Sequence, residues 1–400
     1  MNKLLAGVML CATLTSINAQ EKDAVANTLT VQLDGIRQQG YINGFSVAIV
    51  NQNGIRYTRG FGSADLKEDR KYTENTVQNI GSISKTFIGV ALLKAQELGK
   101  LNLDDPINAY LPFKVTNPYF PESTISIRQL ATHTSSLKDP SVYEKRGYIL
   151  KEPNQPGTKA SSNFRPPEDM VPMEVFLKSI FSREGKWYKK NNFLKEKPGA
   201  IFEYSNLGAG LAAYIVQVAT ETPFQEFTTE HILEPLGMTA SGWRFADIDF
   251  SEHSNLYSNT ETQLPFYSLV NYADGGLILS AVDMGKYLSE LIKGQNGNGK
   301  ILTTASYEEL FTPQLAADNF KERNESALSD EYNSGIFMGF SAKGYIGHTG
   351  SDPGVATFMF FNPKTQIGKI LMVNTDLGRD GIQEFIAVWK TLEEYESKLD

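Results

Sequence analysis

The sequence predicts a mixed α/β fold in which one antiparallel sheet is assembled from both ends of the chain, is flanked by helices and is interrupted by a mainly helical domain. Two observations lead to this expectation. Strand-like segments lie near the start of the chain and again after residue 335, and helical patterns fill the region between them. The two ends should therefore share one sheet that buries its faces against helices. A length of 400 residues, 41% of them apolar, permits the sizeable core that such a fold needs.

The individual elements follow from hydrophobic periodicity. Strands are expected at residues 45–50, 55–59, 336–340, 344–348, 355–361 and 368–374. Helices are expected at residues 24–39, 84–98, 126–133, 173–181, 206–219, 281–293 and 382–394. One domain over residues 20–400 should then comprise a sheet subdomain, at about 24–80 and 330–400, and a helical subdomain with insertions, at about 81–329.

Turn and capping residues place several of these boundaries. Asn53-Gly54, between the first two strands, is the dipeptide most typical of a tight hairpin. Gly99 stands where a left-handed residue would end the preceding helix. Ser126 and Gln129 have the capping-box spacing, in which each side chain accepts a hydrogen bond from the other residue's backbone N–H.

Residues 138–200 differ in character from the rest of the chain. Many charges accompany the prolines of this stretch, which include Pro153, Pro156, Pro166, Pro167, Pro172 and Pro198. Because proline interrupts helices and inner strands, we expect a long surface excursion that holds a single helix at 173–181. This excursion should also form a wall of the substrate pocket.

The first nineteen residues predict a secretory signal. Lys3 supplies the positive start, residues 4–14 a short apolar stretch, and Ile17-Asn18-Ala19 a small-residue cleavage site. An apolar stretch this short does not span a bilayer, which takes about 20 residues. We therefore expect a periplasmic or secreted protein without an integral membrane segment; an uncleaved membrane anchor is the alternative.

Composition excludes several classes of function. Lysine and arginine total 38 against 46 acidic residues, so the formal charge is −8. The sequence therefore lacks the excess of basic residues that a nucleic-acid-binding surface needs. Cys11 is the only cysteine and falls within the predicted signal. Once the signal is removed, the chain should have no disulfides, thiolate metal sites or catalytic cysteine. The four histidines are scattered, and none begins a His-Glu-x-x-His motif. The sequence thus predicts no metal, no cofactor and no nucleic acid partner, and it leaves the oligomeric state open.

Ser82 and Lys85 are the first candidate catalytic pair. They form a Ser-x-x-Lys motif after Gly81, at the start of a strongly apolar helix. One helical turn places positions i and i+3 on the same face, and a partly desolvated amine beside a hydroxyl can act as its base. Ser135 and Lys138 repeat the spacing, but they lead into the proline-rich excursion rather than a buried helix.

Two further motifs complete an ordered set. Tyr204-Ser205-Asn206 begins a predicted helix, which would hold the phenol at a rigid junction, whereas the similar Tyr257 lies in a serine- and asparagine-rich stretch. His348-Thr349-Gly350 ends a predicted strand whose hairpin partner begins near Val355. The other His-Thr pair, at residues 133–134, only closes a helix in this interpretation.

In this order the three motifs resemble those of the serine β-lactamase and D-alanyl-D-alanine carboxypeptidase superfamily, and most closely its class C-like branch. The resemblance extends through most of the chain after the signal and implies a β-lactamase/transpeptidase-like fold. It implies that Ser82 is the nucleophile, that Lys85 and Tyr204 share the proton transfers, and that Asn206 binds the acyl amide of the substrate. It further implies that His348, Thr349 and Gly350 face the leaving or carboxylate side. Backbone N–H groups of Ser82 and Ser351 would form the oxyanion hole.

One departure from the pattern bears on the substrate. Many β-lactamases of this branch carry Lys-Thr-Gly where this chain has His348, and free histidine, with a reference pKa of about 6.5, is mostly neutral above that pH. The resemblance therefore implies an exported serine hydrolase acting on D-amino-acid peptides or amides of cell-wall type, a DD-carboxypeptidase or penicillin-binding type of enzyme. The alternatives are a β-lactamase or esterase of the same fold and a non-catalytic protein that binds penicillin or muropeptides.

Overall fold

A computed structural model describes residues 22–157 and 161–399. The predicted secretory signal at 1–19 lies outside the described residues. The strands are β1 Gly44–Asn51, β2 Gly54–Asp65, β3 Arg70–Lys71, β4 Val77–Asn79, β5 Tyr148–Leu150, β6 Phe164–Arg165, β7 Tyr267–Leu269, β8 Ile278–Ser280, β9 Asn333–Ser334, β10 Gly339–Phe340, β11 Ile346–Asp352, β12 Val355–Asn362 and β13 Ile367–Val373.

A first helix covers residues 22–37. The labelled α-helices are α2 Ser84–Glu97, α3 Ile127–Ala131, α4 Ser141–Gly147, α5 Met173–Phe181, α6 Asn206–Thr220, α7 Phe224–Thr228, α8 Ala281–Gln295, α9 Thr304–Leu310 and α10 Arg379–Tyr395. Short 3₁₀ turns lie between them, of which η1 Gly81–Ile83 precedes α2 directly.

A seven-stranded sheet joins the two ends of the chain. Its strand order is β10-β11-β12-β13-β1-β2-β3, with antiparallel pairing throughout. The ends meet where β1 pairs with β13, with Val47 opposite Leu371. This confirms the expected fold class, an antiparallel sheet built from both chain ends and flanked by helices.

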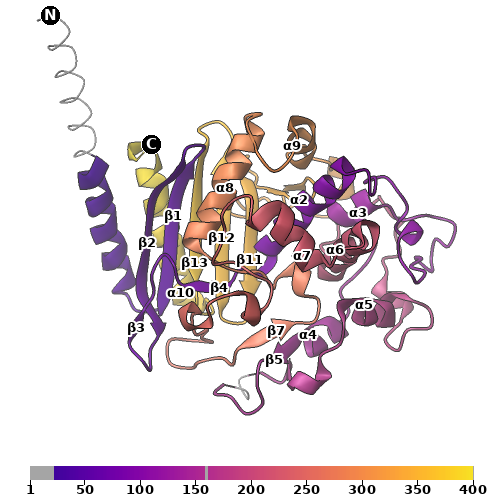
Figure 1. The fold of residues 1–400 in the computed structure, drawn as a ribbon, viewed down its shortest axis with the longest axis horizontal. Helices are drawn as coiled ribbons and strands as arrows, with labels where there is room; N and C mark the ends of the chain where they lie inside the picture. The colour runs from indigo at the N-terminus through magenta and orange to yellow at the C-terminus, as the bar shows by residue number, and fades with distance from the viewer. Residues whose placement is uncertain (1–21, 158–160, 400) are drawn as a thin grey trace, which may run out of the picture.

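Helices cover both faces of this sheet (Figure 1). β1 is buried along its whole length, and its side chains alternate between two cores as the pleat requires. Phe45, Val47 and Ile49 pack on the side of α10 and the helix 22–37. Ala48 and Val50 face the other core, which the sheet shares with α2, α6 and α8. The site described below lies at the edge of this second core.

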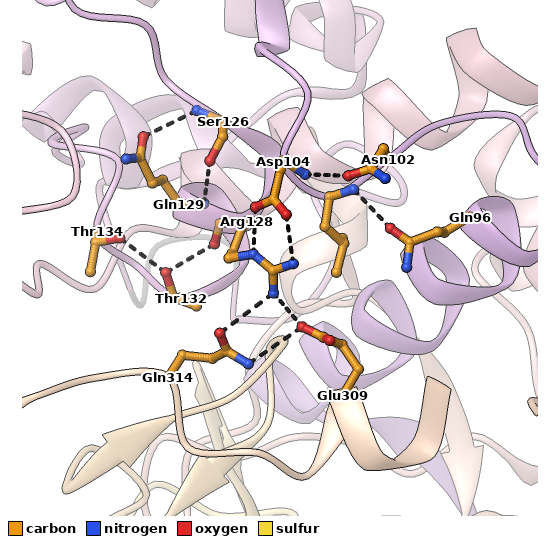
Figure 2. Close-up of polar contacts among 11 residues, drawn as sticks. Gln96, Asn102, Asp104, Ser126, Arg128, Gln129, Thr132, Thr134, Glu309 and Gln314 are labelled. Carbon is orange, nitrogen blue, oxygen red and sulfur yellow. Dashed lines mark hydrogen bonds and ion pairs between the residues drawn. The ribbon is translucent and has the colours of Figure 1, made fainter. Parts of the chain in front are cut away.

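Arg128 links the helices on that side. Its guanidinium donates to both carboxylate oxygens of Asp104, at 2.6 and 3.1 Å, and also bonds Glu309 of α9 (Figure 2). Next to it the predicted capping box is present, with Gln129 N–H donating to Ser126 Oγ at 3.2 Å and Ser126 N–H to Gln129 Oε1 at 3.1 Å. The short helix α3 is thereby fixed at both its start and its outer face.

Three expectations about secondary structure were wrong. The excursion 138–200 holds α4, β5 and β6 in addition to the expected helix at 173–181. The strand β5 is stabilised by pairing with β7, which lies more than a hundred residues further along the chain. The residues of β5 alone therefore do not show the hydrophobic pattern of a strand. Of the strand expected at 336–340 only β10 forms, whereas the strand expected to end at His348 continues to Asp352, because β11 stays paired with β12.

Candidate active site

Ser82 and Lys85 lie together where η1 passes into α2. The Lys85 ammonium donates a hydrogen bond to Ser82 Oγ at 2.9 Å, as expected of residues one helical turn apart. Lys85 has no exposed surface, whereas Ser82 is partly exposed. A substrate can therefore reach the hydroxyl but not the amine behind it.

Burial controls the charge of Lys85. Desolvation lowers the pKa of the Lys85 ammonium and outweighs the carboxylates of Asp274 and Asp352, which act to raise it. The ammonium also donates to the backbone carbonyl of Asp274 at 2.7 Å, so its position is fixed from two sides. A lysine with a lowered pKa can exist as the neutral amine that a serine nucleophile needs as its base.

Tyr204 lies on the other side of the pair. The Lys85 nitrogen stands 5.1 Å from the centre of the Tyr204 ring, and the imidazole of His133 stacks on that ring at 4.4 Å. Burial raises the pKa of Tyr204 well above its ordinary value, although a hydrogen bond with Ser82 acts to lower it. The neutral phenol is thus held beside Ser82, where it can pass on a proton.

Two glycines bring η1 and β11 unusually close together. A Cβ atom on Gly81 would lie 2.7 Å from the backbone nitrogen of Ser351, and one on Gly350 would lie 3.3 Å from that of Ser82. The φ angle of Gly81 is +58°, a left-handed conformation that also favours glycine. The two backbone groups predicted to form the oxyanion hole therefore border the same narrow gap, and that role stays a prediction.

His348 and Thr349 are both engaged by a carboxylate. His348 Nδ1 lies 3.0 Å from Asp330 Oδ2 and 2.6 Å from the Thr349 carbonyl oxygen. The Thr349 backbone N–H and hydroxyl donate to Asp330 at 2.8 and 3.1 Å. Burial acts to raise the pKa of Asp330, but His348 and these hydrogen bonds outweigh it and lower that pKa to about 2. A protonated His348 thus already has a buried counter-ion.

Asn206 is held by a second carboxylate. Its side-chain amide donates to Asp139 Oδ2 at 2.9 Å, and its backbone N–H donates to the same oxygen at 2.8 Å. Asp139 Oδ1 accepts from Ser205 Oγ at 2.9 Å and from Leu207 N–H at 3.1 Å. Asp139 therefore ties the start of α6, and with it Asn206, to the beginning of the excursion.

Two more acids join the excursion to the site. The Tyr143 hydroxyl donates to Asp274 Oδ2 at 2.8 Å, and the Tyr148 hydroxyl to Asp352 Oδ1 at 2.9 Å. Burial raises the pKa of Asp274 to about 6 against the opposing effect of Lys85. Burial and the neighbouring Asp274 raise the pKa of Asp352 to about 7. These carboxyl groups are therefore protonated far more readily than exposed ones.

Sequence reasoning missed these four acids and His133. Asp139, Asp274, Asp330 and Asp352 belong to no motif, and only the fold brings them to the nucleophile. The sequence predicts only that His133 closes a helix, yet its ring stacks on Tyr204. One signal was present in the sequence, since His133-Thr134 repeats the His-Thr pair of His348-Thr349. Ser135, of the second Ser-x-x-Lys motif, is itself buried, and its hydroxyl accepts from Leu137 N–H at 3.4 Å.

Residues 22–157 and 161–399 contain neither a metal-binding cluster nor a membrane-spanning helix. No group of three or more histidine, cysteine or acidic side chains in these ranges is arranged to hold a metal ion. In the same part of the chain, no helix combines the length and apolar character needed to cross a membrane.

The sequence resembles curated proteins over most of its length. It is 28% identical over 339 residues to a Bacillus subtilis protein named "Putative penicillin-binding protein PbpX", and the match covers 83% of this chain and 71% of that one. It is 24% identical over 341 residues to Protein flp of Staphylococcus aureus, covering 84% of this chain and 60% of the relative. The chain thus spans only part of these longer proteins.

Solved structures share the fold. D-amino acid amidase from Ochrobactrum anthropi superposes with a TM-score of 0.67 at 18% identity, covering 92% of this chain and 99% of that one. The octameric penicillin-binding protein homologue from Pyrococcus abyssi superposes with a TM-score of 0.66 at 21% identity, covering 93% of this chain and 77% of that one. A family model described as Beta-lactamase matches residues 25–393, nearly the whole chain. The chain therefore belongs to the beta-lactamase family, whose members are serine hydrolases.

Proposed function

We propose that this protein is an exported hydrolase that works through an acyl-serine intermediate on D-amino-acid peptides or amides of cell-wall type. The observation that carries this proposal is the hydrogen bond of 2.9 Å between the buried Lys85 amine and the accessible hydroxyl of Ser82. The name of one relative supports the substrate class, since that relative is a D-amino acid amidase.

In the proposed acylation, Ser82 Oγ attacks the substrate carbonyl carbon. Its proton passes to the neutral amine of Lys85, either directly or through the hydroxyl of Tyr204. The oxygen that becomes negative would accept hydrogen bonds from the backbone N–H groups of Ser82 and Ser351. Collapse of this intermediate breaks the bond to the leaving amine, which takes up the proton. Water then attacks the ester by the reverse route, releases the acid and restores the serine.

The His348–Asp330 pair supports a particular kind of leaving group. Because the carboxylate of Asp330 lies 3.0 Å from His348 Nδ1, the pair carries no net charge when the imidazole is protonated. A substrate carboxylate on this side would have to compete with Asp330 for the same cation. We therefore favour peptides and amides whose leaving group is uncharged over β-lactams and over substrates that release a free D-amino acid.

Labelling with a fluorescent penicillin tests the acyl-serine step. We expect wild-type protein to be labelled covalently and Ser82→Ala to be unlabelled yet folded, because the substitution removes only the attacking oxygen. Ser135→Ala, in the second Ser-x-x-Lys motif, is the matched control and should label like wild type. Labelling that persists in Ser82→Ala would show that the nucleophile is elsewhere. A protein that labels but turns over no substrate would be the non-catalytic binder.

A substrate panel tests the proposed class. It should compare D-amino-acid amides, peptides ending in D-Ala-D-Ala, cephalosporins and short-chain nitrophenyl esters by kcat/KM. We expect the amides to exceed the corresponding free acids by at least tenfold, since one unfavourable charge contact is worth about 1–3 kcal/mol. A preference for cephalosporins or for esters would instead identify the β-lactamase or the esterase alternative.

Export is tested separately from activity. We propose that residues 1–19 direct secretion, so protein recovered outside the cytoplasm should begin at Gln20 by mass spectrometry. Protein lacking residues 2–19 should remain in the cytoplasm. Recovery of an intact N-terminus in a membrane fraction would instead support the uncleaved anchor.

A further inference from the structure

A basic recess lies between α4 and β6 in the excursion. Lys145 and Arg146 of α4 and Arg165 of β6 line it, together with the polar side chains of Ser141 and Asn163. Ser141 and Lys145 are four residues apart and so share one face of the helix. Three cationic side chains thus converge on one recess in a protein whose overall formal charge is −8.

The positive charge of the recess is only partly compensated. Asp169 accepts from Arg165 Nε at 2.8 Å and lies 4.0 Å from Arg146 Nη1. Lys145 is exposed and has no ion pair with any residue in the described ranges. Glu144, on the same helix, and Glu168, next to Asp169, are exposed and do not line the recess. Three cations facing one carboxylate leave an excess of positive charge.

The same short segment separates this recess from the nucleophile. Tyr143, between the recess residues Ser141 and Lys145, donates to Asp274, whose backbone carbonyl accepts from Lys85. Figure 1 shows α4 beside β5 and β7 at one edge of the molecule. Residues 139–146 therefore border the active site through Asp139 and Tyr143, and they border the recess through Ser141, Lys145 and Arg146.

Asn206 is the residue expected to contact the acyl part of a substrate; its side-chain amide donates to Asp139, and Ser141 of the recess follows Asp139 by two residues. We propose that the recess of Lys145, Arg146 and Arg165 is a subsite for a carboxylate on the acyl side of a peptide substrate, several atoms away from the reacting carbonyl. Guanidinium groups bind carboxylates through two parallel hydrogen bonds, and a lysine adds a mobile point charge. The proposal rests on the proposed function and deepens it by naming the charge of the acyl chain.

Matched peptide amides test this subsite. One series carries a glutamate at the first, second or third position before the reacting D-residue, and its partner series carries glutamine at the same position. With wild-type protein we expect kcat/KM to be about tenfold higher for glutamate at one of these positions, and the advantage to shrink as salt is raised. Lys145→Ala, which breaks no ion pair in the described ranges, should lose part of that preference.

The double variant Lys145→Ala/Arg165→Ala should abolish the preference while glutamine peptides react at the wild-type rate. Arg183→Ala/Lys189→Ala, which removes the same charge from exposed positions of the same excursion, should keep the preference. No glutamate preference in wild type, or a preference that survives the double variant, would overturn the subsite.

Binding to Ser82→Ala protein separates this proposal from the proposed function. By calorimetry we expect the favoured glutamate peptide to bind about tenfold more tightly than its glutamine partner, and Lys145→Ala/Arg165→Ala to remove the difference. This measurement needs no turnover. Equal dissociation constants refute the subsite even if the enzyme is active, whereas failure of wild type to acylate any peptide refutes the proposed function even if the difference is present.

Discussion

Replacing Asp139 tests whether one carboxylate holds the acyl side of the site. Each of its two oxygens accepts two hydrogen bonds, from Ser205 Oγ and Leu207 N–H on one, and from the backbone and side-chain nitrogens of Asn206 on the other. These four bonds cap the first turn of α6 and orient the Asn206 amide. Asp139→Ala removes all four, whereas Asp139→Asn keeps one acceptor oxygen and therefore at most two.

The expected loss of stability follows from these bonds. A hydrogen bond contributes about 1 kcal/mol net, and because Asp139 is partly exposed, water replaces some of what is lost. We expect Asp139→Ala to lower the free energy of unfolding by about 2–4 kcal/mol and Asp139→Asn by about half as much. Asp249→Ala is the control, since the exposed Asp249 bonds Ser251 at the start of a 3₁₀ turn and its loss should lower the free energy of unfolding far less than the loss of Asp139.

Urea unfolding measures the stability change, and acylation by fluorescent penicillin measures the effect on the site. At a temperature where Asp139→Ala is folded, its acylation rate should fall by at least tenfold, because Asn206 is no longer held; Asp249→Ala should acylate like wild type. If Asp139→Ala lies within about 0.5 kcal/mol of wild type and acylates normally, the carboxylate has no part in positioning Asn206.

Three further substitutions probe the charges around the nucleophile. Lys85→Met should abolish acylation. Because burial lowers the pKa of Lys85 in the folded protein, the unfolded chain binds more protons at alkaline pH. Urea unfolding should therefore show wild type gaining stability relative to Lys85→Met as the pH rises toward 10. A pH-independent difference would contradict this. The pKa of Asp330, about 2, makes its carboxylate stabilise the fold fully only above its unfolded pKa of about 4. Between pH 4 and pH 2, acid unfolding should therefore show wild type losing about 2 kcal/mol more than Asp330→Asn. Tyr143→Phe removes a hydrogen bond that lowers the pKa of Asp274, which is about 6. The pH at which acylation falls on the acidic side should therefore shift to a higher value. An unchanged acidic limb would show that Asp274 does not govern it.

The features that could be predicted from the sequence are those with a short-range signal. Ser82 and Lys85 are one helical turn apart, so a local spacing already places them together. The residues around Val47 and around Leu371 form short apolar runs, which predict buried strands locally. The sheet follows because two buried strands need neighbouring strands to pair with. The capping box at Ser126 is equally local, and it forms as expected.

The acids of the site could not be predicted, because their positions depend on contacts across the chain. Asp139 meets Asn206 from 67 residues away, and Tyr148 meets Asp352 from 204 residues away. A single aspartate in a loop has no periodicity or spacing that separates it from a solvated one. The strand β5 was missed for the same reason, since its partner β7 lies in another part of the sequence.

These acids change how the charge of the site should be understood. The resemblance placed His348 on the leaving or carboxylate side of the substrate, but Asp330 already lies 3.0 Å from its Nδ1. On the opposite side, burial holds the pKa of Asp352 at about 7, so its charge, and with it the field at Lys85, changes near neutral pH. Neither side of the nucleophile therefore offers a constant, uncompensated positive charge. The excess positive charge lies instead in the recess beyond α4, which is why recognition of an anionic substrate should depend on the length and charge of its acyl chain rather than on its leaving group.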